Sequence, residues 1–350
     1  MKELLIINKD LCTLFGPSGN EDLISEKIKE LITPYKLENA ELYFDKIGNL
    51  YYHIPKENAP RLMINAHMDE VGFMVTSINS DGTLSFGTVG GFDNIILPSK
   101  KVICENGLKG VILSKPIHLI SRKARKKPIE VEDLVIDIGA ESKEEAEKLI
   151  SLGDYFTFDL PYVEFGEDLI CSKALDDRLG CAIMVRLIME IKEKSIDVPY
   201  DLFFAFTCRE EVGYSSCFGA SERIKPSYAI VLESKAVSDL FGVEEERQVA
   251  HLGDGGVVSF ADCGTIFDRN LIKHIMALCK ENGIKYQVNR SVSGGNDSAN
   301  IQRSASGAKV GLISIPSRYI HSSSNVIHKT DMESIYKTVL AVLTDKNPLK

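Results

Sequence analysis

The sequence predicts an α/β protein in which helices cover both faces of a sheet and a small β-rich unit is inserted into the chain. Strand-like apolar runs alternate with helical patterns over most of the length, as in sheets sandwiched by helices. The 350 residues exceed what one hydrophobic core usually holds. Between about 75 and 165, short alternating segments rich in Gly, Ser and Lys interrupt the α/β pattern, which indicates the insertion.

Apolar spacing defines each predicted element. The first helix is predicted over 21–34, because apolar residues recur there at helical spacing after Asn20, a residue type that often caps helix N-termini. Continuous apolar runs then predict strands at 50–54, 62–66, 202–207, 228–232, 257–260 and 310–315. Further helical patterns cover about 178–194, 268–281 and 330–344.

The segment 75–165 is predicted to be an insertion because motifs that must meet in space stand on both sides of it. Residues 1–74 and 166–350 are therefore expected to form the main domain together, with 75–165 as a separate unit. The basic run 122–128 within this unit lacks interleaved aromatic residues, so we interpret it as a solvated loop.

Charge and cysteine usage narrow the function class and the compartment. The net charge of -9 argues against a dedicated nucleic-acid binder. No apolar stretch approaches the roughly 18 residues of a membrane span, and the N-terminus lacks the pattern of a signal peptide. Eight cysteines without a CxxC pair indicate reduced thiols rather than a disulfide framework or a zinc-thiolate site. We expect a cytoplasmic protein without nucleic-acid or membrane partners.

Potential ligand side chains stand at the ends of predicted strands, where α/β folds gather their functional sites. Each of these side chains is weak evidence for a functional site when taken alone. Adjacent acids at a helix start often serve as caps, and a lone His is usually structural. His118, His251 and His328 are interpreted in that way. The side chains that stand out as a set are His67, Asp69, Asp176, Glu210, Glu211, Glu233 and His321.

The combination of carboxylates and imidazoles suits Zn²⁺, Co²⁺ or Mn²⁺. Two metals about 3.5–4 Å apart need a bridging carboxylate, a terminal ligand each and a free base, and the set supplies that inventory. In an extended segment His67 and Asp69 point the same way, so the carboxylate can orient the imidazole.

The chain resembles the dinuclear aminopeptidases of metallopeptidase family 42, the glutamyl or deblocking aminopeptidases, over essentially its whole length. The motifs that carry the resemblance are AHMDEVGF (66–73), DIGAESKEEAEKL (137–149), SKALDDRLGC (172–181), REEVG (209–213), SGGNDSA (293–299) and IPSRYIHS (315–322). The resemblance implies a zinc-exopeptidase-like mixed sheet flanked by helices. It also implies that 1–74 and 166–350 form the catalytic domain and that 75–165 is a small β-barrel or PDZ-like dimerisation domain.

The resemblance further implies an aminopeptidase that hydrolyses N-terminal residues from peptides with two divalent ions per subunit, Zn²⁺ or Co²⁺. Asp176 would bridge the ions, and Glu210 would be the general base acting on a metal-bridging water. Asp69 matches the carboxylate behind His67. The terminal ligands would be His67 with Glu233 and Glu211 with His321, and the sequence leaves open which ligand serves which metal. Some relatives form tetrahedral TET particles, so a homo-oligomer between dimer and dodecamer is expected.

Departures from the family pattern bear on specificity. Members usually have Asp where this chain has Glu233, which predicts a shift in metal preference or geometry. The family's GGTDA-like loop is 294–298 here, and 253–256 carries an acid in place of a cation. Three other functions compete with this interpretation: a deacylase of N-acyl amino acids, an endoglucanase, as the family is sometimes labelled, and a non-catalytic binding protein. The absence of Trp argues against a glycosidase, and retention of Glu210 argues against a non-catalytic role.

Overall fold

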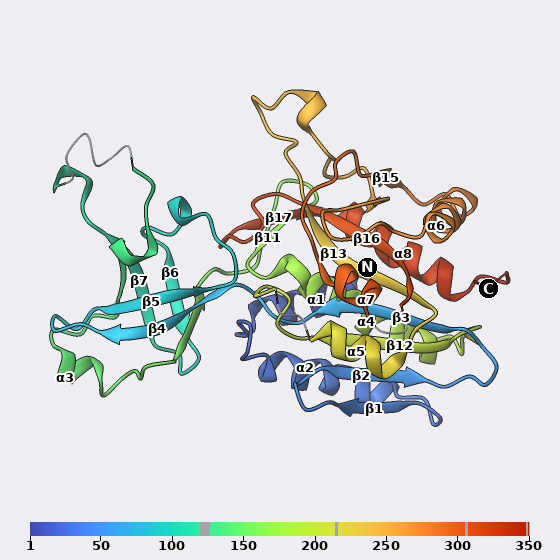
Figure 1. The fold of residues 1–350 in the computed structure, drawn as a ribbon, viewed down its shortest axis with the longest axis horizontal. Coiled ribbons are helices and arrows are strands. Elements are labelled where there is room, and N and C mark those ends of the chain that lie inside the picture. The colour runs from blue at the N-terminus through green and yellow to red at the C-terminus, as the bar shows by residue number, and fades with distance from the viewer. Residues whose placement is uncertain (120–126, 214–215, 305–306, 348, 350) are drawn as a thin grey trace.

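The computed structural model describes residues 1–119, 127–213, 216–304, 307–347 and 349. They form a large mixed sheet with flanking helices and, beside it, a small closed barrel (Figure 1). The predicted fold class is therefore confirmed. Most of the basic run 122–128 lies outside the described residues, so its interpretation as a solvated loop stays a prediction. Within the described ranges, no helix has both the length and the apolar character that a membrane crossing requires.

The described residues form the helices α1 (Lys2–Thr13), α2 (Asp22–Ile32), α3 (Lys143–Ala146), α4 (Leu175–Glu193), α5 (Cys217–Ile224), α6 (Arg269–Glu281), α7 (Asp297–Gln302) and α8 (Lys329–Leu343). Four of them, α2, α4, α6 and α8, follow the predicted apolar periodicity, whereas α1, α3, α5 and α7 were not predicted. The prediction that Asn20 caps the second helix is wrong. Glu21 occupies the cap position, and the Asn20 side chain instead donates a hydrogen bond to Glu105 across 2.8 Å.

The strands form three groups. The large sheet contains β1 (Glu41–Phe44), β2 (Leu50–Ile54), β3 (Arg61–His67), β12 (Asp201–Thr207), β13 (Tyr228–Ala236), β14 (Gly256–Val258), β15 (Tyr286–Val288) and β16 (Lys309–Ser317). The barrel contains β4 (Gly72–Ile78), β5 (Leu84–Val89), β6 (Lys101–Cys104), β7 (Lys109–Ser114), β8 (Leu134–Asp137) and β9 (Tyr155–Phe158). A small sheet contains β10 (Val163–Phe165), β11 (Leu169–Ser172) and β17 (Asn325–His328).

Strand direction in the large sheet decides where the predicted ligands meet. The strand order is β1-β2-β12-β3-β13-β16-β14-β15. The four central strands, β12, β3, β13 and β16, run parallel to one another. Their carboxyl ends therefore lie at one edge of the sheet, which is where α/β proteins usually place their sites.

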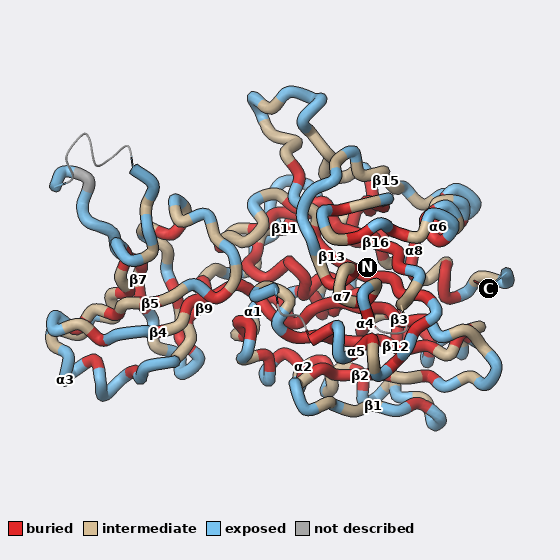
Figure 2. The backbone as a smooth tube through the Cα atoms, in the orientation of Figure 1, coloured by how far each residue is buried: buried red, intermediate tan, exposed pale blue. Residues whose placement is uncertain are grey.

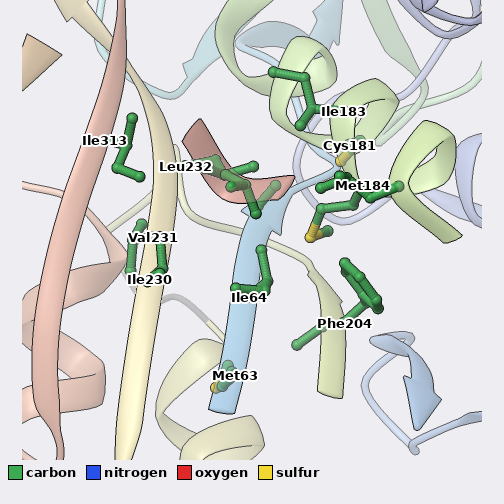
Figure 3. Packing of buried hydrophobic residues seen from close by; sticks show 14 of the residues in the cluster. Met63, Ile64, Cys181, Ile183, Met184, Phe204, Ile230, Val231, Leu232 and Ile313 are labelled. Carbon is green, nitrogen blue, oxygen red and sulfur yellow. The ribbon is translucent and has the colours of Figure 1, made fainter. Parts of the chain in front are cut away.

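Helices cover the central strands on both faces, because side chains alternate along each strand. Ile64, Leu232 and Phe204 share one face and lie near Cys181 and Met184 of α4 (Figure 3). On the opposite face, the Asn65 amide donates to Asp297 of α7 across 3.0 Å and accepts from Cys217 of α5 across 3.1 Å. The central sheet is consequently the most deeply buried part of the chain (Figure 2).

The barrel has a hydrophobic core of its own, separate from the core of the large sheet. Its centre is aromatic: the Phe73 ring stacks on Phe92 and meets the edges of Phe86 and Phe158. The barrel strands lie between Gly72 and Phe158, whereas β10 pairs with β11 outside the barrel. We propose that the predicted 75–165 unit is a separate domain whose boundary lies slightly earlier in the chain, so that it includes all of β4.

Glu70 links the barrel to the start of α4 through buried charges. Its Oε1 lies 2.6 Å from Nζ of Lys173 and 3.5 Å from Nη2 of Arg178. Its Oε2 accepts a hydrogen bond from Thr157 of β9 across 2.9 Å. Glu70, Lys173 and Arg178 are all at most 4% exposed, so the ion pairs are shielded from water.

Replacing Glu70 with alanine is expected to lower the free energy of unfolding by about 3–5 kcal/mol, because it leaves the buried Lys173 ammonium without its carboxylate. Urea unfolding of the metal-free protein measures the loss. The matched control is Asp159→Ala, which removes an ion pair between the partly exposed Asp159 and the exposed Lys109 and should cost no more than about 1 kcal/mol. Equal losses in the two variants would show that the buried pair does not stabilise the junction.

Candidate metal centre

The predicted side chains meet at the carboxyl edge of the four parallel strands. His67 ends β3, Glu233 lies in β13, and the Glu210–Glu211 pair follows β12. His321 follows β16, and Asp176 lies in the first turn of α4. The site is thus built from segments far apart in sequence, and the parallel strands bring them together.

These side chains form two groups that share one carboxylate. In the first group, Nε2 of His67 lies 3.5 Å from Oδ1 of Asp176 and 3.6 Å from Oε1 of Glu233. In the second, Nε2 of His321 lies 3.3 Å from Oδ2 of Asp176 and 3.2 Å from Oε2 of Glu211. The potential ligand atoms of each group lie within 4.8 Å of one another. Asp176 therefore presents a different oxygen to each group.

Each group fits a divalent ion. Carboxylate oxygens and imidazole nitrogens are the ligands that Zn²⁺ and similar metals accept. Oδ1 of Asp176 is buried and has no hydrogen-bond partner among the described residues. Burying such an oxygen is costly unless a positive charge satisfies it.

The site concentrates acidic groups away from water. Burial raises the pKa of Glu211 and of Glu233 well above the usual range, and the nearby Asp176 raises both further. Burial opposes the charged form of Asp176 too, but the neighbouring imidazoles of His321 and His67 hold its pKa well below its usual value. Burial likewise opposes a charge on His321, whereas Asp176 and Glu211 raise its pKa to about 9. Such a pocket favours a bound cation.

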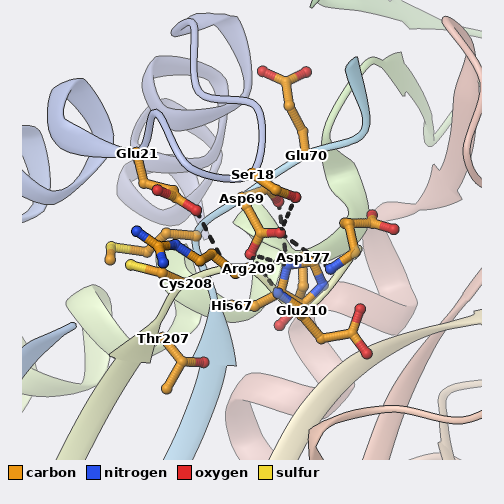
Figure 4. Close-up of polar contacts among 12 residues, drawn as sticks. Ser18, Glu21, His67, Asp69, Glu70, Asp177, Thr207, Cys208, Arg209 and Glu210 are labelled. Carbon is orange, nitrogen blue, oxygen red and sulfur yellow. Dashed lines mark hydrogen bonds and ion pairs between the residues drawn. The ribbon is translucent and has the colours of Figure 1, made fainter. Parts of the chain in front are cut away.

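Asp69 has more contacts than the sequence predicts. Its Oδ1 lies 3.4 Å from Nδ1 of His67, as expected for a carboxylate that orients an imidazole. The same carboxylate accepts hydrogen bonds from the backbone N–H groups of Glu210 and Glu211, each across 3.1 Å (Figure 4). Ser18 donates a further hydrogen bond to it across 2.6 Å. Asp69 therefore positions both the imidazole and the segment that carries the two glutamates.

Glu210 lies beside both groups and belongs to neither. With Asp176, Glu233 and His321 it lines a cavity of about 300 Å³. Burial raises the pKa of its carboxyl to about 8; His67 opposes this shift and Asp297 adds to it. A carboxyl group with such a pKa can exchange a proton near neutral pH.

Several residues around the cavity were not predicted as functional. Its walls include Lys235 near the end of β13 and, from loops, the hydroxyl, acidic and amide side chains of Ser259, Asp262, Asn289 and Asn296. Asn296 lies in the 293–299 motif that carries the resemblance, but no ligand-type spacing assigned a role to any of these residues. The histidines interpreted as structural or surface residues lie outside both groups: His118 is exposed, and His328 accepts a hydrogen bond from the N–H of Thr330 at the start of α8.

Comparison with known proteins gives a consistent set of relatives. Residues 48–337 match the model of the M42 glutamyl aminopeptidase family. The glutamyl aminopeptidase of Lactococcus lactis is 28% identical over 355 aligned residues, which cover 98% of this chain and 96% of that protein.

Two solved structures share the fold over nearly the whole chain. The TET aminopeptidase of the archaeon Thaumarchaeota archaeon SCGC AB-539-E09 superposes with a TM-score of 0.94 at 30% identity and covers 99% of this chain and 97% of that one. The TET1 peptidase of Pyrococcus horikoshii, which can assemble into a tetrahedron or a large octahedral shell, superposes with a TM-score of 0.85 at 32% identity. That alignment covers 98% of this chain and 99% of the other.

Proposed function

Because this chain belongs to the M42 glutamyl aminopeptidase family and is a hydrolase of peptide bonds, we propose that it removes residues from the N-termini of peptides at a dinuclear metal centre. The observation that carries the proposal is the orientation of the Asp176 carboxylate. Its two oxygens face two different groups of ligand-type side chains. A single metal would leave one of these groups without a function.

Each side chain then has a role that its position supports. His67 and Glu233 would hold one ion and Glu211 and His321 the other, and Asp176 would offer one carboxylate oxygen to each. When bound, two divalent ions, Zn²⁺ or Co²⁺, would lower the pKa of the attacking water and polarise the scissile carbonyl. Glu210 takes a proton from the attacking water onto its carboxylate and delivers it to the leaving amine, since it lines the cavity without belonging to either group. Asp69 orients His67 and holds the backbone of Glu210.

The rival enzyme classes fit this site less well. A glycosidase needs two carboxyl groups flanking a sugar bond. Here the acids Asp176, Glu211 and Glu233 each lie within 3.6 Å of an imidazole nitrogen, an arrangement suited to ligands. A deacylase of N-acyl amino acids would use similar chemistry, so substrates must separate it from an aminopeptidase.

A substrate panel tests the proposed activity. We expect the metal-loaded protein to hydrolyse at least one of the leucyl, glutamyl and lysyl anilides and to leave the N-acetyl amino acids and a cellulose oligomer intact. Chelation of metal should abolish the activity, and added Zn²⁺ or Co²⁺ should restore it. Anilide release is followed by absorbance, with the chelated protein as the control. Hydrolysis of only the sugar or only the acylated substrates would overturn the proposal.

We further propose that the chain acts as a cytoplasmic homo-oligomer, between a dimer and a dodecamer, assembled through the barrel. The assembly of the Pyrococcus horikoshii relative supports the oligomer. The free cysteines support the compartment, since six of the eight are buried as thiols. Peptides are the proposed partners, and no nucleic acid or membrane is required.

A further inference from the structure

The loop between α1 and α2 contacts residues that support the metal centre on the side away from the cavity. None of the loop residues lines the cavity itself. Ser18, in this loop, donates to the Asp69 carboxylate. Glu21, at its end, occupies the cap position of α2 without capping that helix with its side chain. Its Oε1 instead accepts hydrogen bonds from the backbone N–H groups of Gly19, across 2.8 Å, and Arg209, across 3.2 Å (Figure 4).

Three consecutive N–H groups after β12 are therefore bound by buried carboxylates. Glu21 accepts from Arg209, and Asp69 accepts from Glu210 and Glu211. Glu21 and Asp69 are only 6% and 0% exposed, so water does not replace these acceptors readily. Two carboxylates from separate segments thus fix the backbone of the turn.

The turn needs this support because its conformation is unfavourable on its own. Arg209 has a φ of 64°, in the left-handed region that non-glycine residues adopt only when their surroundings enforce it. Among the described residues, no hydrogen bond holds the Glu210 carboxylate itself, so its position depends on the backbone that carries it.

We propose that Glu21 is a positioning residue: it holds the Arg209 N–H and thereby places the Glu210 carboxylate beside the metal centre, while Ser18 assists through Asp69. This inference rests on the proposed function of Glu210 as the general base. Glu21 does not touch the reacting atoms. A misplacement of a catalytic group by about 1 Å can cost about 100-fold in rate, which sets the expected scale.

The test compares Glu21→Ala with the conservative Glu21→Gln, whose amide oxygen can still accept both N–H bonds. In the metal-loaded protein, Glu21→Ala should lower kcat about 10–100-fold, with KM within about twofold of the wild type. Glu21→Gln should keep kcat within about threefold. Glu26→Ala is the matched control, since Glu26 is an exposed acid on α2 that pairs with Lys29 and should leave kcat unchanged.

A second readout does not depend on activity. Hydrogen–deuterium exchange should become faster at the amides of 209–211 in Glu21→Ala, and Ser18→Ala should show a smaller effect at 210 and 211. Metal content should stay at the wild-type value. If Glu21→Ala shows the same exchange rates and the same kcat as Glu26→Ala, the proposal is overturned. It is also overturned if Glu21→Gln loses as much kcat as Glu21→Ala does. If the wild type cleaves no anilide, the proposed function fails, whereas the exchange experiment still decides whether Glu21 holds the turn.

Discussion

Replacing Asp176 with alanine is expected to remove both metal ions from the subunit and to lower kcat/KM at least about 1,000-fold. Each metal group contains one oxygen of this carboxylate, so its loss opens both groups at once. Metals contribute several kcal/mol of transition-state stabilisation, and each 1.36 kcal/mol is about tenfold in rate. Metal content after dialysis, measured by mass spectrometry, and anilide hydrolysis report the two effects.

The matched control for Asp176→Ala is Asp268→Ala, which removes another acid from a helix start. Asp268 accepts a hydrogen bond from the N–H of Leu271 at the first turn of α6, away from the cavity. Its loss should cost about 1 kcal/mol of stability and leave metal content and activity unchanged. If Asp176→Ala retains two ions per subunit, the bridging role is wrong.

Replacing Glu210 with glutamine is expected to lower kcat about 100–10,000-fold while two metal ions stay bound, because the amide cannot take up a proton. KM should change little, since Glu210 belongs to neither ligand group. The steady-state kinetics are measured with the metal-loaded variant, and the exposed Glu246→Gln provides the control. Unchanged turnover would remove Glu210 from the role of base, and loss of metal would make it a ligand instead.

The α/β architecture could be predicted from the sequence because the central strands are continuous apolar runs. Polar residues at both ends mark where each of these strands begins and ends. The helix α1 was missed: Leu4, Ile7 and Leu11 are buried at helical spacing, but the continuous apolar run 4–7, in which Ile6 is exposed, hides that spacing. Asn20 was assigned as a helix cap from its intrinsic preference. A tertiary contact with Glu105 on the barrel overrides that preference, and no local pattern could have shown it.

The location of the site could be predicted, but its detailed arrangement could not. Acidic and imidazole side chains at strand ends indicated where ligands gather. The resemblance implied the grouping of His67 with Glu233 and of Glu211 with His321, which the residues alone do not reveal because it depends on strand order. The contacts of Ser18 were equally hidden, because the loop around it has the composition of an ordinary turn.

The central claim is that two metal ions bind on either side of Asp176. Crystals grown with zinc and measured at the zinc absorption edge test it most directly. Two anomalous peaks per subunit are expected about 3.5–4 Å apart, one beside each oxygen of Asp176, the first contacting His67 and Glu233 and the second His321 and Glu211. A single peak, or peaks that do not contact Asp176, would contradict the dinuclear centre.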